Sequence, residues 1–551
     1  MRQRDGQIFL ILALVIGAIT GLAVVAFIVL TERLGMRLYP VGGAPWRRVL
    51  LPVVGSLSIG YLLYRYFPNA RGSGVPQTKA ALFARDGRIT LRTVFGKFFC
   101  TSATLASGIP LGREGPSVQV GAGIASVLGR SLGLSTEQVK KLIPVGAAAA
   151  IAAAFNTPLA AVLFSLEEIT GDLYAPVMGA VVLASATAWI VLRVSLGDHP
   201  LFKVPQYQLG RPAELAVYAV LGVAGGVVSA AFTKILLGIR ARFLRLPQNT
   251  AWLQPVVGGL AVGIMGWFVP QVLGVGYGYV GEALNGRMAF QLMAILVVLK
   301  LLAVTISYAS GNAGGIFGPS LFIGAMLGGT VGTVAHHLFP AYTATPGAYA
   351  LVGMGAVFAG VVRAPMTSVL MIFEMTQDYA VIVPLMIANL VSLFIASRLQ
   401  KEPIYEGLAV QDGIHLPSPD MRQRYGQRQV ARVMHKAGDS LPGDLPVSEA
   451  IERIRPTGLR TWLVADQRGV IGVVNLATLE QSQGTGEKVF DLVDPMLFPH
   501  VHADQGLDLA LERLGSNQLD IIPVVNRANV HQLEGVVTLR DVLDAYGVNR
   551  A

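Results

Sequence analysis

Residues 112–116 (GREGP) and 315–319 (GIFGP) each place a Gly-Pro step at the start of an apolar stretch, and residues 72–76 (GSGVP) combine glycine and proline in the same way. Proline is favoured in the first turn of a helix, where its missing N–H is not needed, and glycine allows a sharp turn just before it. Each motif therefore predicts a helix that begins abruptly in a hydrophobic region. Helices that start inside a bilayer are typical of transporters and channels.

The composition is that of a membrane protein. Of 551 residues, 53% are hydrophobic and 14% charged, against about 25% charged in soluble proteins, and the mean hydropathy is +0.56. Residues 8–31 carry no charge and would span about 36 Å as a helix, enough to cross a bilayer. Because Arg2 and Arg4 precede them, we expect an uncleaved helix with a cytoplasmic N-terminus, and a polar tail on the same side. A single cysteine, Cys100, permits no intramolecular disulfide.

Further apolar stretches predict an all-α polytopic membrane domain over residues 1–410. They fall at about 48–67, 88–110, 116–130, 143–167, 175–195, 212–240, 252–272, 288–308, 320–338, 347–375 and 380–398. Lys97 and Lys300 are isolated charges within them, which we expect to pair with carboxylates or backbone carbonyls inside the bundle.

The membrane domain contains an internal repeat. Residues 145–167 align with residues 352–374 with eight identities in 23 positions, including one proline and one glutamate. Since a bias toward Ala and Gly does not explain these colinear residues, we expect a duplicated unit with broken helices, with its halves at about 8–195 and 212–410. In such transporters the binding site lies near the bilayer midplane, between the repeats.

Helix N-termini that converge in a low dielectric favour anions. The first turn exposes unpaired N–H groups and about half a positive charge. An anion held by these dipoles, without a full Lys or Arg charge, can leave again, as conduction requires. The glycine-proline turns therefore predict a site for a monovalent anion.

Glu114 lies within GREGP, beside the N–H groups that would hold this anion. Its carboxylate can take the anion's place, and once protonated it loses that attraction and moves away. Anion entry and proton uptake would then be linked at one residue. A structural salt bridge with Arg113 is equally consistent with the spacing.

Four ordered motifs resemble the CLC family of chloride channels and chloride/proton antiporters. They are GSGVP at 72–76, GREGP at 112–116, FNTPLAAVLFSLEE at 155–168 and GIFGP at 315–319, and Tyr405 follows in KEPIYEGL. The resemblance covers about residues 8–410. It implies two inverted repeats with broken helices, and a homodimer with one transport pathway in each subunit.

The resemblance also implies which groups bind the ion. The Ser73 hydroxyl, the backbone amides of Ile316 and Phe317 and the Tyr405 hydroxyl would coordinate the central chloride, and Glu114 falls at the family's external gating glutamate. Serine at the position of Ser73 is typical of chloride-preferring members. Taken without the family, Ser73 could be a plain helix N-cap and Tyr405 a residue of the interfacial belt.

Glu168 bears on the choice between antiporter and channel. It occupies the position of the internal proton-transfer glutamate that antiporters of the family commonly carry, where many channels have an apolar residue. In the repeat, Glu167 has a counterpart in Glu374, whereas Glu168 matches Met375. We predict a chloride/proton antiporter, with a passive chloride channel as the alternative. Two glutamates capping a helix at the cytoplasmic interface would also fit.

The polar tail follows a linker at 411–429 and contains a second repeat. GVVNL at 472–476 parallels GVVTL at 535–539, and Ala-x-Glu-Arg occurs at both 450–453 and 510–513. Each unit is predicted to run helix, strand, strand, helix. The two units, 430–486 and 487–551, resemble a cytosolic α/β pair of CBS domains.

CBS pairs often bind an adenine nucleotide such as ATP, ADP or AMP. In nucleotide-binding units, a Thr and an Asp spaced as Thr538 and Asp541 commonly hold phosphate and ribose. The first unit departs from this pattern with Asn475 and Thr478. A purely structural or dimerising role is the alternative, and transport itself is expected to require no cofactor.

Other classes of protein fit the sequence less well. None of the eight histidines is followed by Glu, as a His-Glu-x-x-His zinc protease would need, and no Gly-x-Ser-Gly of a rhomboid-like serine protease occurs, so we expect no enzyme. Residues 1–410 hold 29 basic and 15 acidic residues, which argues against a pore for divalent cations. A basic excess on the lipid-embedded half also argues against nucleic-acid binding. We expect an integral protein of the bacterial cytoplasmic membrane.

Overall fold

The protein consists of two compact units, Met1–Leu416 and Pro417–Ala551, close to the predicted boundary at residue 410. The computed structural model describes residues 2–171, 177–197, 200–205, 207, 212–414, 429–436, 438–457, 460–493, 498–517 and 519–546. Most of the predicted linker lies outside these residues. Seven of the described helices are long and apolar enough to cross a membrane.

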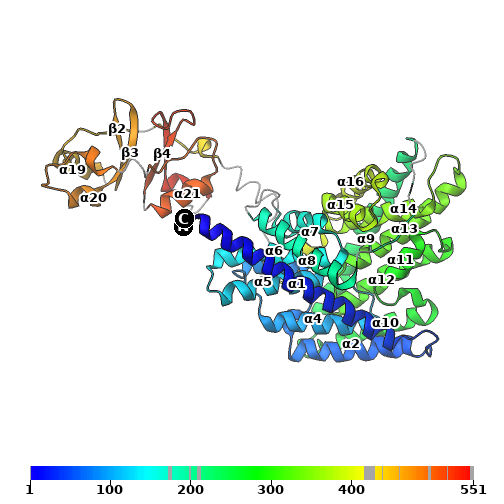
Figure 1. The fold of residues 1–551 in the computed structure, drawn as a ribbon. Helices are drawn as coiled ribbons and strands as arrows, with labels where there is room; N and C mark the ends of the chain where they lie inside the picture. The colour runs from blue at the N-terminus through cyan, green and yellow to red at the C-terminus, as the bar shows by residue number, and fades with distance from the viewer. Residues whose placement is uncertain are drawn as a thin grey trace. The chain divides into compact units, whose positions relative to one another are not determined.

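The named elements in the described part of the first unit are all helices (Figure 1). Its first half comprises α1 (Arg2–Leu38), α2 (Arg47–Arg65), α3 (Val75–Ala84), α4 (Leu91–Ala106), α5 (Glu114–Ser131), α6 (Thr136–Phe155), α7 (Pro158–Phe164), a π-helical turn η2 (Ser165–Thr170) and α8 (Met178–Leu196). Its second half comprises α9 (Glu214–Leu244), α10 (Gln254–Phe268), α11 (Tyr277–Leu284), α12 (Phe290–Ser310), α13 (Phe317–Leu338), α14 (Pro346–Val362), α15 (Pro365–Thr376), α16 (Ile382–Leu399) and α17 (Ile404–Gln411). Short 3-10 turns are η1 (Pro68–Ala70), η3 (Gln248–Thr250), η4 (Pro270–Val272) and η5 (Tyr379–Val381).

Two of the predicted apolar stretches are each divided into two helices. Residues 143–167 divide between α6 and α7, and residues 347–375 divide between α14 and α15. Asn156 and Arg363 end the first helix of each pair in the left-handed conformation, with φ of 60° and 66°. A proline follows each of them two residues later, and proline disfavours helical geometry in the residue before it. The two breaks are therefore encoded in the same way in both halves.

The predicted inverted repeats are confirmed. Helices α9 to α16 repeat the order of α1 to α8, and α1 packs on α8 as α9 packs on α16. The amide of Gly112 donates to the carbonyl of Gly315, and the amide of Gly315 donates to the carbonyl of Gly112, both at 2.7 Å. Such an exchange of identical contacts is the mark of a two-fold relation. The turns before α5 and α13 are thus paired at the centre of the unit.

Glu167, in η2 after α7, and Glu374, near the end of α15, form a second reciprocal contact between the two halves. Glu167 accepts from the amide of Thr367 at 2.8 Å, at the start of α15. Glu374 accepts from the amides of Leu159 and Ala160 at 3.0 and 2.7 Å, at the start of α7. Each glutamate therefore satisfies N–H groups that the first helical turn leaves unpaired. The expectation that Glu167 serves the shared scaffold is confirmed.

The second unit holds two α/β halves. The first half comprises β1 (Leu441–Pro442), α19 (Val447–Ile454), β2 (Thr461–Asp466), β3 (Gly469–Asn475) and α20 (Leu476–Gln481), and the second comprises α21 (Leu507–Ser516), β4 (Ile521–Val525), β5 (Leu533–Thr538) and α22 (Leu539–Tyr546). Three 3-10 turns are η6 (Val430–Arg432), η7 (Arg455–Thr457) and η8 (Val489–Leu492). Strand β2 pairs parallel with β1 and antiparallel with β3, and β4 pairs antiparallel with β5. The predicted order of helix, strand, strand, helix is present in both halves.

The two halves of this unit exchange short segments relative to the predicted boundary at residue 486. Val430 is buried in the core of the second half, and its amide donates to the carbonyl of Gln505 at 2.9 Å. Val489 is buried in the core of the first half, and its amide donates to the carbonyl of Leu445 at 3.0 Å. Sequence similarity between the halves could not reveal this, because the exchanged segments lie outside the repeated motifs.

We expect Glu374→Ala to destabilise the membrane unit by about 1–2 kcal/mol, because two helix-start amides lose their acceptor. Glu167→Ala, its symmetry mate, should cost a similar amount. Thermal unfolding in detergent measures both, with Glu137→Ala on the exposed surface as the control. Unchanged melting temperatures in both cap variants would contradict the capping role.

Candidate functional site

The carboxylate of Glu114 lies where an anion is expected. Glu114 is fully buried at the start of α5, and its Oε2 accepts from the amide of Gly318 at 3.2 Å, in the first turn of α13. The Tyr277 hydroxyl donates to the other carboxylate oxygen. A negative group is thus held by the positive end of a helix from the opposite repeat.

Glycine on both sides of this carboxylate leaves room for it in its observed position. A Cβ atom added at Gly112 would collide with Glu114 Oε2, and one added at Gly318 would lie 3.0 Å from it. The reciprocal hydrogen bonds between Gly112 and Gly315 hold the two turns at this separation. The glycines of the two motifs therefore let the backbone approach the charged group closely.

Arg113 does not form the alternative salt bridge. Its guanidinium lies 3.5 Å from Glu32 and 5.6 Å from the ring centroid of Tyr277. Among the described residues, Glu114 has hydrogen bonds with Tyr277 and Gly318 and no ion pair with Arg113. The carboxylate is consequently held by hydrogen bonds alone.

Ser73 and Tyr405 present buried hydroxyl groups without partners. Both residues are at most 1% exposed, and in the described part of the chain neither Ser73 Oγ nor Tyr405 Oη has a hydrogen-bond partner. Buried hydroxyls are nearly always paired. Two unpaired O–H donors fit the coordination of a dehydrated anion, because each can donate to it.

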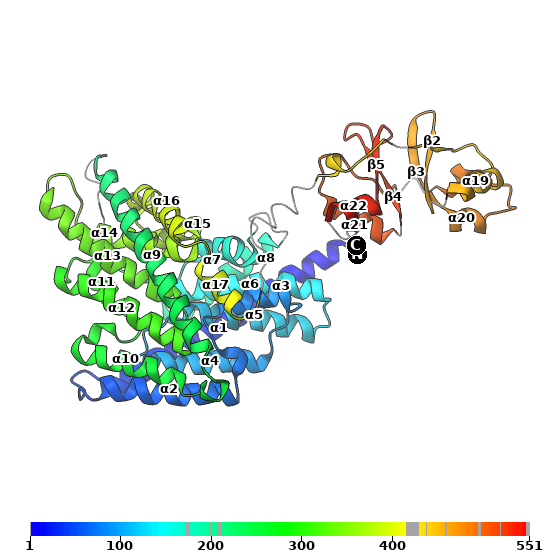
Figure 2. The ribbon, with the colours of Figure 1, turned by 180° about the vertical axis from the view of Figure 1, so that it is seen from behind.

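These two hydroxyls are not explained by the simpler interpretations. Gly74, rather than Ser73, is the N-cap of α3, and Tyr405 is too deeply buried for an interfacial belt. Helix α17, which carries Tyr405, packs against α3, and the two lie together in Figure 2. The Ser73 amide donates to the Tyr308 hydroxyl at 3.1 Å, which fixes the turn before α3.

Ile316 and Phe317 form the start of α13 and are fully buried. The Phe317 ring packs against Phe155, Phe164 and Phe358, with centroid distances of 4.9, 5.6 and 4.4 Å. These rings belong to α6, α7 and α14, so the end of α13 is fixed by three other helices. Its first amides, which have no intrahelical acceptor, are therefore held in a water-excluded place.

Glu168 lies in the π-helical turn η2 and forms an ion pair with Lys79 of α3, with 2.7 Å between Oε1 and Nζ. The two side chains are 10% and 6% exposed. Glu167 turns instead toward α15. The interpretation of both glutamates as helix caps is therefore wrong for Glu168, whose carboxylate pairs with Lys79. π-helical turns of this kind are frequent at functional sites.

Three residues of the site, Lys79, Tyr277 and Tyr308, are not among those predicted from the sequence. Lys79 is an isolated charge six residues after Ser73, which could have marked it in the same way as Lys97 and Lys300. Tyr277 follows Gly276, whose φ of 87° matches the 105° of Gly74 before α3. Tyr308 carries no local signal, because only the fold brings it to Ser73.

Lys97 and Lys300 pair with backbone carbonyls, one of the two predicted kinds of partner. Lys97 Nζ donates to Gly72 at 2.7 Å, and Lys300 Nζ donates to Gly274 at 2.7 Å and to Val272 at 3.0 Å. Both ammonium groups are fully buried and occupy equivalent places in the two repeats. They hold the turns that precede α3 and α11.

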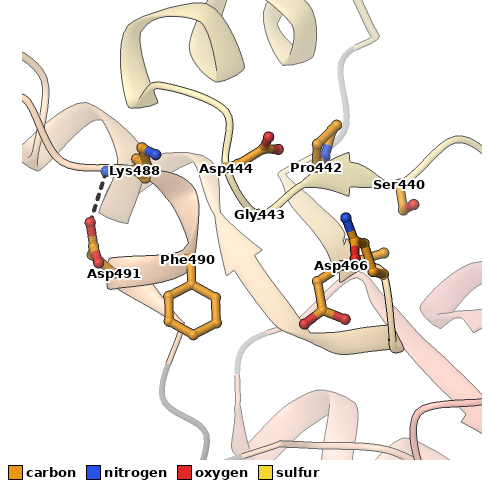
Figure 3. Close-up of a pocket in the computed structure, with 10 residues that line it drawn as sticks. Ser440, Pro442, Gly443, Asp444, Asp466, Lys488, Phe490 and Asp491 are labelled. Carbon is orange, nitrogen blue, oxygen red and sulfur yellow. Dashed lines mark hydrogen bonds between the residues drawn. The ribbon is translucent and has the colours of Figure 1, made fainter.

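In the second unit, Thr538 and Asp541 are adjacent. The Thr538 amide and hydroxyl donate to Asp541 Oδ2 at 2.8 and 2.6 Å, at the start of α22. A cavity of about 630 Å³ lies elsewhere, between β1, the β2–β3 turn and η8, and its polar lining includes Asp444, Asp466 and Lys488 (Figure 3). Nucleotide binding at Thr538 and Asp541 stays a prediction.

Two inverted repeats, broken helices and a buried carboxylate against a helix start define an integral membrane protein of the anion-transport kind. A sequence model described as voltage gated chloride channel matches residues 55–397, and a CBS domain model matches residues 495–547. The chain belongs to the voltage gated chloride channel family, also called CLC, and carries a CBS domain in its tail.

Relatives agree with this assignment. The chain is 34% identical to an H(+)/Cl(-) exchange transporter ClcA of Vibrio campbellii, over 66% of this chain and 79% of the relative. It is also 34% identical to a putative chloride channel protein ClcB-like of Ralstonia nicotianae, over 65% and 85%.

Solved structures confirm the fold. The structure of a slow cyanobacterial Cl-/H+ antiporter superposes with a TM-score of 0.68 at 29% identity, covering 73% of this chain and 97% of that one. A eukaryotic CLC transporter, at 21% identity and a TM-score of 0.63, covers 97% of both chains. The second likeness extends the shared fold to the tail.

Proposed function

We propose that this protein exchanges chloride for protons across a membrane, as a secondary active transporter. The observation that carries the proposal is the Glu114 carboxylate bound by the Gly318 amide. A carboxylate bound at an anion site can be displaced by a chloride and neutralised by a proton. The names of the Vibrio campbellii relative and the cyanobacterial structure support the same exchange.

In the proposed cycle, the hydroxyls of Ser73 and Tyr405 and the amides of Ile316 and Phe317 hold a chloride. When Glu114 takes up a proton, its negative charge disappears and the attraction to the start of α13 falls. The Gly318 amide then becomes available to an anion. When the proton leaves, the carboxylate returns and competes with the anion, so the two movements are linked at one place.

Glu168 is proposed to receive protons from the cytoplasm and to pass them toward Glu114. It is the second buried carboxylate of the site, and its ion pair with Lys79 connects it to α3, the helix that begins just after Ser73. No symmetry mate exists, because Met375 stands at the equivalent position. A group that serves only proton movement, and not the shared scaffold, needs no counterpart in the other repeat.

The setting of the transporter is also a proposal. We infer a bacterial cytoplasmic membrane with both termini in the cytoplasm, and a homodimer with one pathway in each subunit. An adenine nucleotide at Thr538 and Asp541 would regulate transport from the tail. A passive chloride channel of the same fold is the second candidate, and Glu168 argues against it.

Reversal potentials in liposomes under opposed chloride and pH gradients separate exchange from passive conduction. We expect the wild type to move protons against a chloride gradient, so its reversal potential depends on pH. A reversal potential fixed at the chloride value whatever the pH would establish the channel instead.

In the same liposomes, Glu168→Gln is expected to abolish proton movement, because an amide cannot carry the proton, while chloride still flows. Glu114→Gln, which resembles the protonated gate, should uncouple the two ions in the same way. Glu167→Gln is the matched control, since its amide oxygen can still accept from α15 and exchange should persist. Intact proton pumping in Glu168→Gln would remove this route.

Chloride binding can be measured by calorimetry without transport. Tyr405→Phe deletes one buried donor, and a hydrogen bond to a charged group contributes about 1.5–3 kcal/mol, so we expect a Kd at least about tenfold higher. Tyr61→Phe on the exposed surface of α2 is the control. An unchanged Kd in Tyr405→Phe would exclude its hydroxyl from the site.

A further inference from the structure

The buried ion pair between Lys79 and Glu168 is not accounted for by stability. Taking two charges out of water costs several kcal/mol for each ion, and well-packed apolar residues often stabilise a protein equally well or better. Both side chains are at least nine-tenths buried, with 2.7 Å between their charged atoms. Connecting α3 with η2 by this pair therefore has a high desolvation cost, which indicates a role beyond packing.

The pair is also absent from the symmetric scaffold. Lys97 donates to Gly72 before α3, and Lys300 donates to Gly274 before α11, so these two turns are equivalent in the two repeats. In this alignment Gly281 is the residue equivalent to Lys79. Met375 stands opposite Glu168, next to the reciprocal caps Glu167 and Glu374. The second repeat folds in the same way without either charge, so the fold does not require them.

The position of Lys79 connects the anion site with the second glutamate. Helix α3 begins directly after the turn that holds Ser73, and it contacts both η2 and α17. The charged groups that face Glu168 are Lys79 from α3, Glu406 from α17 and Glu167 from its own turn. Of these groups, Lys79 alone is a cation, and it is the one in direct contact with the carboxylate.

We propose that Lys79 is a positioning residue for Glu168, and that their ion pair opens each time Glu168 takes up a proton. The inference rests on the proposed chloride/proton exchange. A proton that binds to the carboxylate cancels the charge that holds the ammonium, and its release restores the pair. Lys79 therefore sets the pH range in which protons enter, and it leaves chloride binding unchanged.

Chloride-driven proton uptake into liposomes, measured over a series of symmetric pH values, tests this. In Lys79→Met, the pH at which proton uptake falls to half its maximum should rise by about one unit or more, because an opposite charge in contact shifts protonation by that amount. Lys79→Arg keeps the cation and should restore the wild-type profile. The chloride Kd, measured by calorimetry, should remain within about twofold of the wild-type value in both variants.

A double-mutant cycle separates positioning from a general structural effect. In a Glu168→Gln background, Lys79→Met should leave chloride flux unchanged, because the group on which Lys79 acts has gone. Equal losses of chloride flux in both backgrounds, or an unshifted pH profile, would overturn the inference while leaving exchange by the wild type in place. A wild type that moves no protons would overturn the proposed function as well, so the two failures are distinguishable.

Discussion

The structure depends on placing a carboxylate against backbone amides where water is excluded. In such a place a charge is stabilised only by groups of the protein. Here these groups are the amide at the start of α13 and the hydroxyl of Tyr277, which both donate hydrogen bonds. Glu114 is bound by dipoles and hydrogen bonds and not by the neighbouring Arg113, which pairs with Glu32. A full opposite charge would hold the carboxylate firmly, whereas dipoles leave it exchangeable with an anion.

This arrangement explains why the chain is built from two inverted repeats. Bringing helix starts from both halves to one point requires the turns before α5 and α13 to meet, and the paired backbone of Gly112 and Gly315 does this. Glu167, Glu374, Lys97 and Lys300 maintain the same symmetry at the ends of other broken helices. Charged groups in the membrane unit thus satisfy free backbone groups, which lipid cannot do.

The residues proposed for transport are departures from that symmetry. Glu114 occupies the place in GREGP that Phe317 occupies in GIFGP, and Glu168 stands opposite Met375. Lys79 likewise lies opposite Gly281. The shared residues maintain the scaffold. The unmatched charged residues are not needed for the scaffold, and they are the ones proposed to bind protons or to position a group that does.

The sequence by itself determined the membrane class, the duplication, the glycine-proline turns and most of the proposed site residues, because these are local patterns of hydropathy and of residues with special backbone geometry. It placed Glu114 beside helix-start amides but could not distinguish those amides from Arg113 as its partner. Only the tertiary structure decided that choice, divided two apolar stretches into separate helices, and brought Lys79 to Glu168 and Tyr308 to Ser73. Contacts between residues 89 and 235 positions apart depend on how helices pack, and no local pattern specifies them.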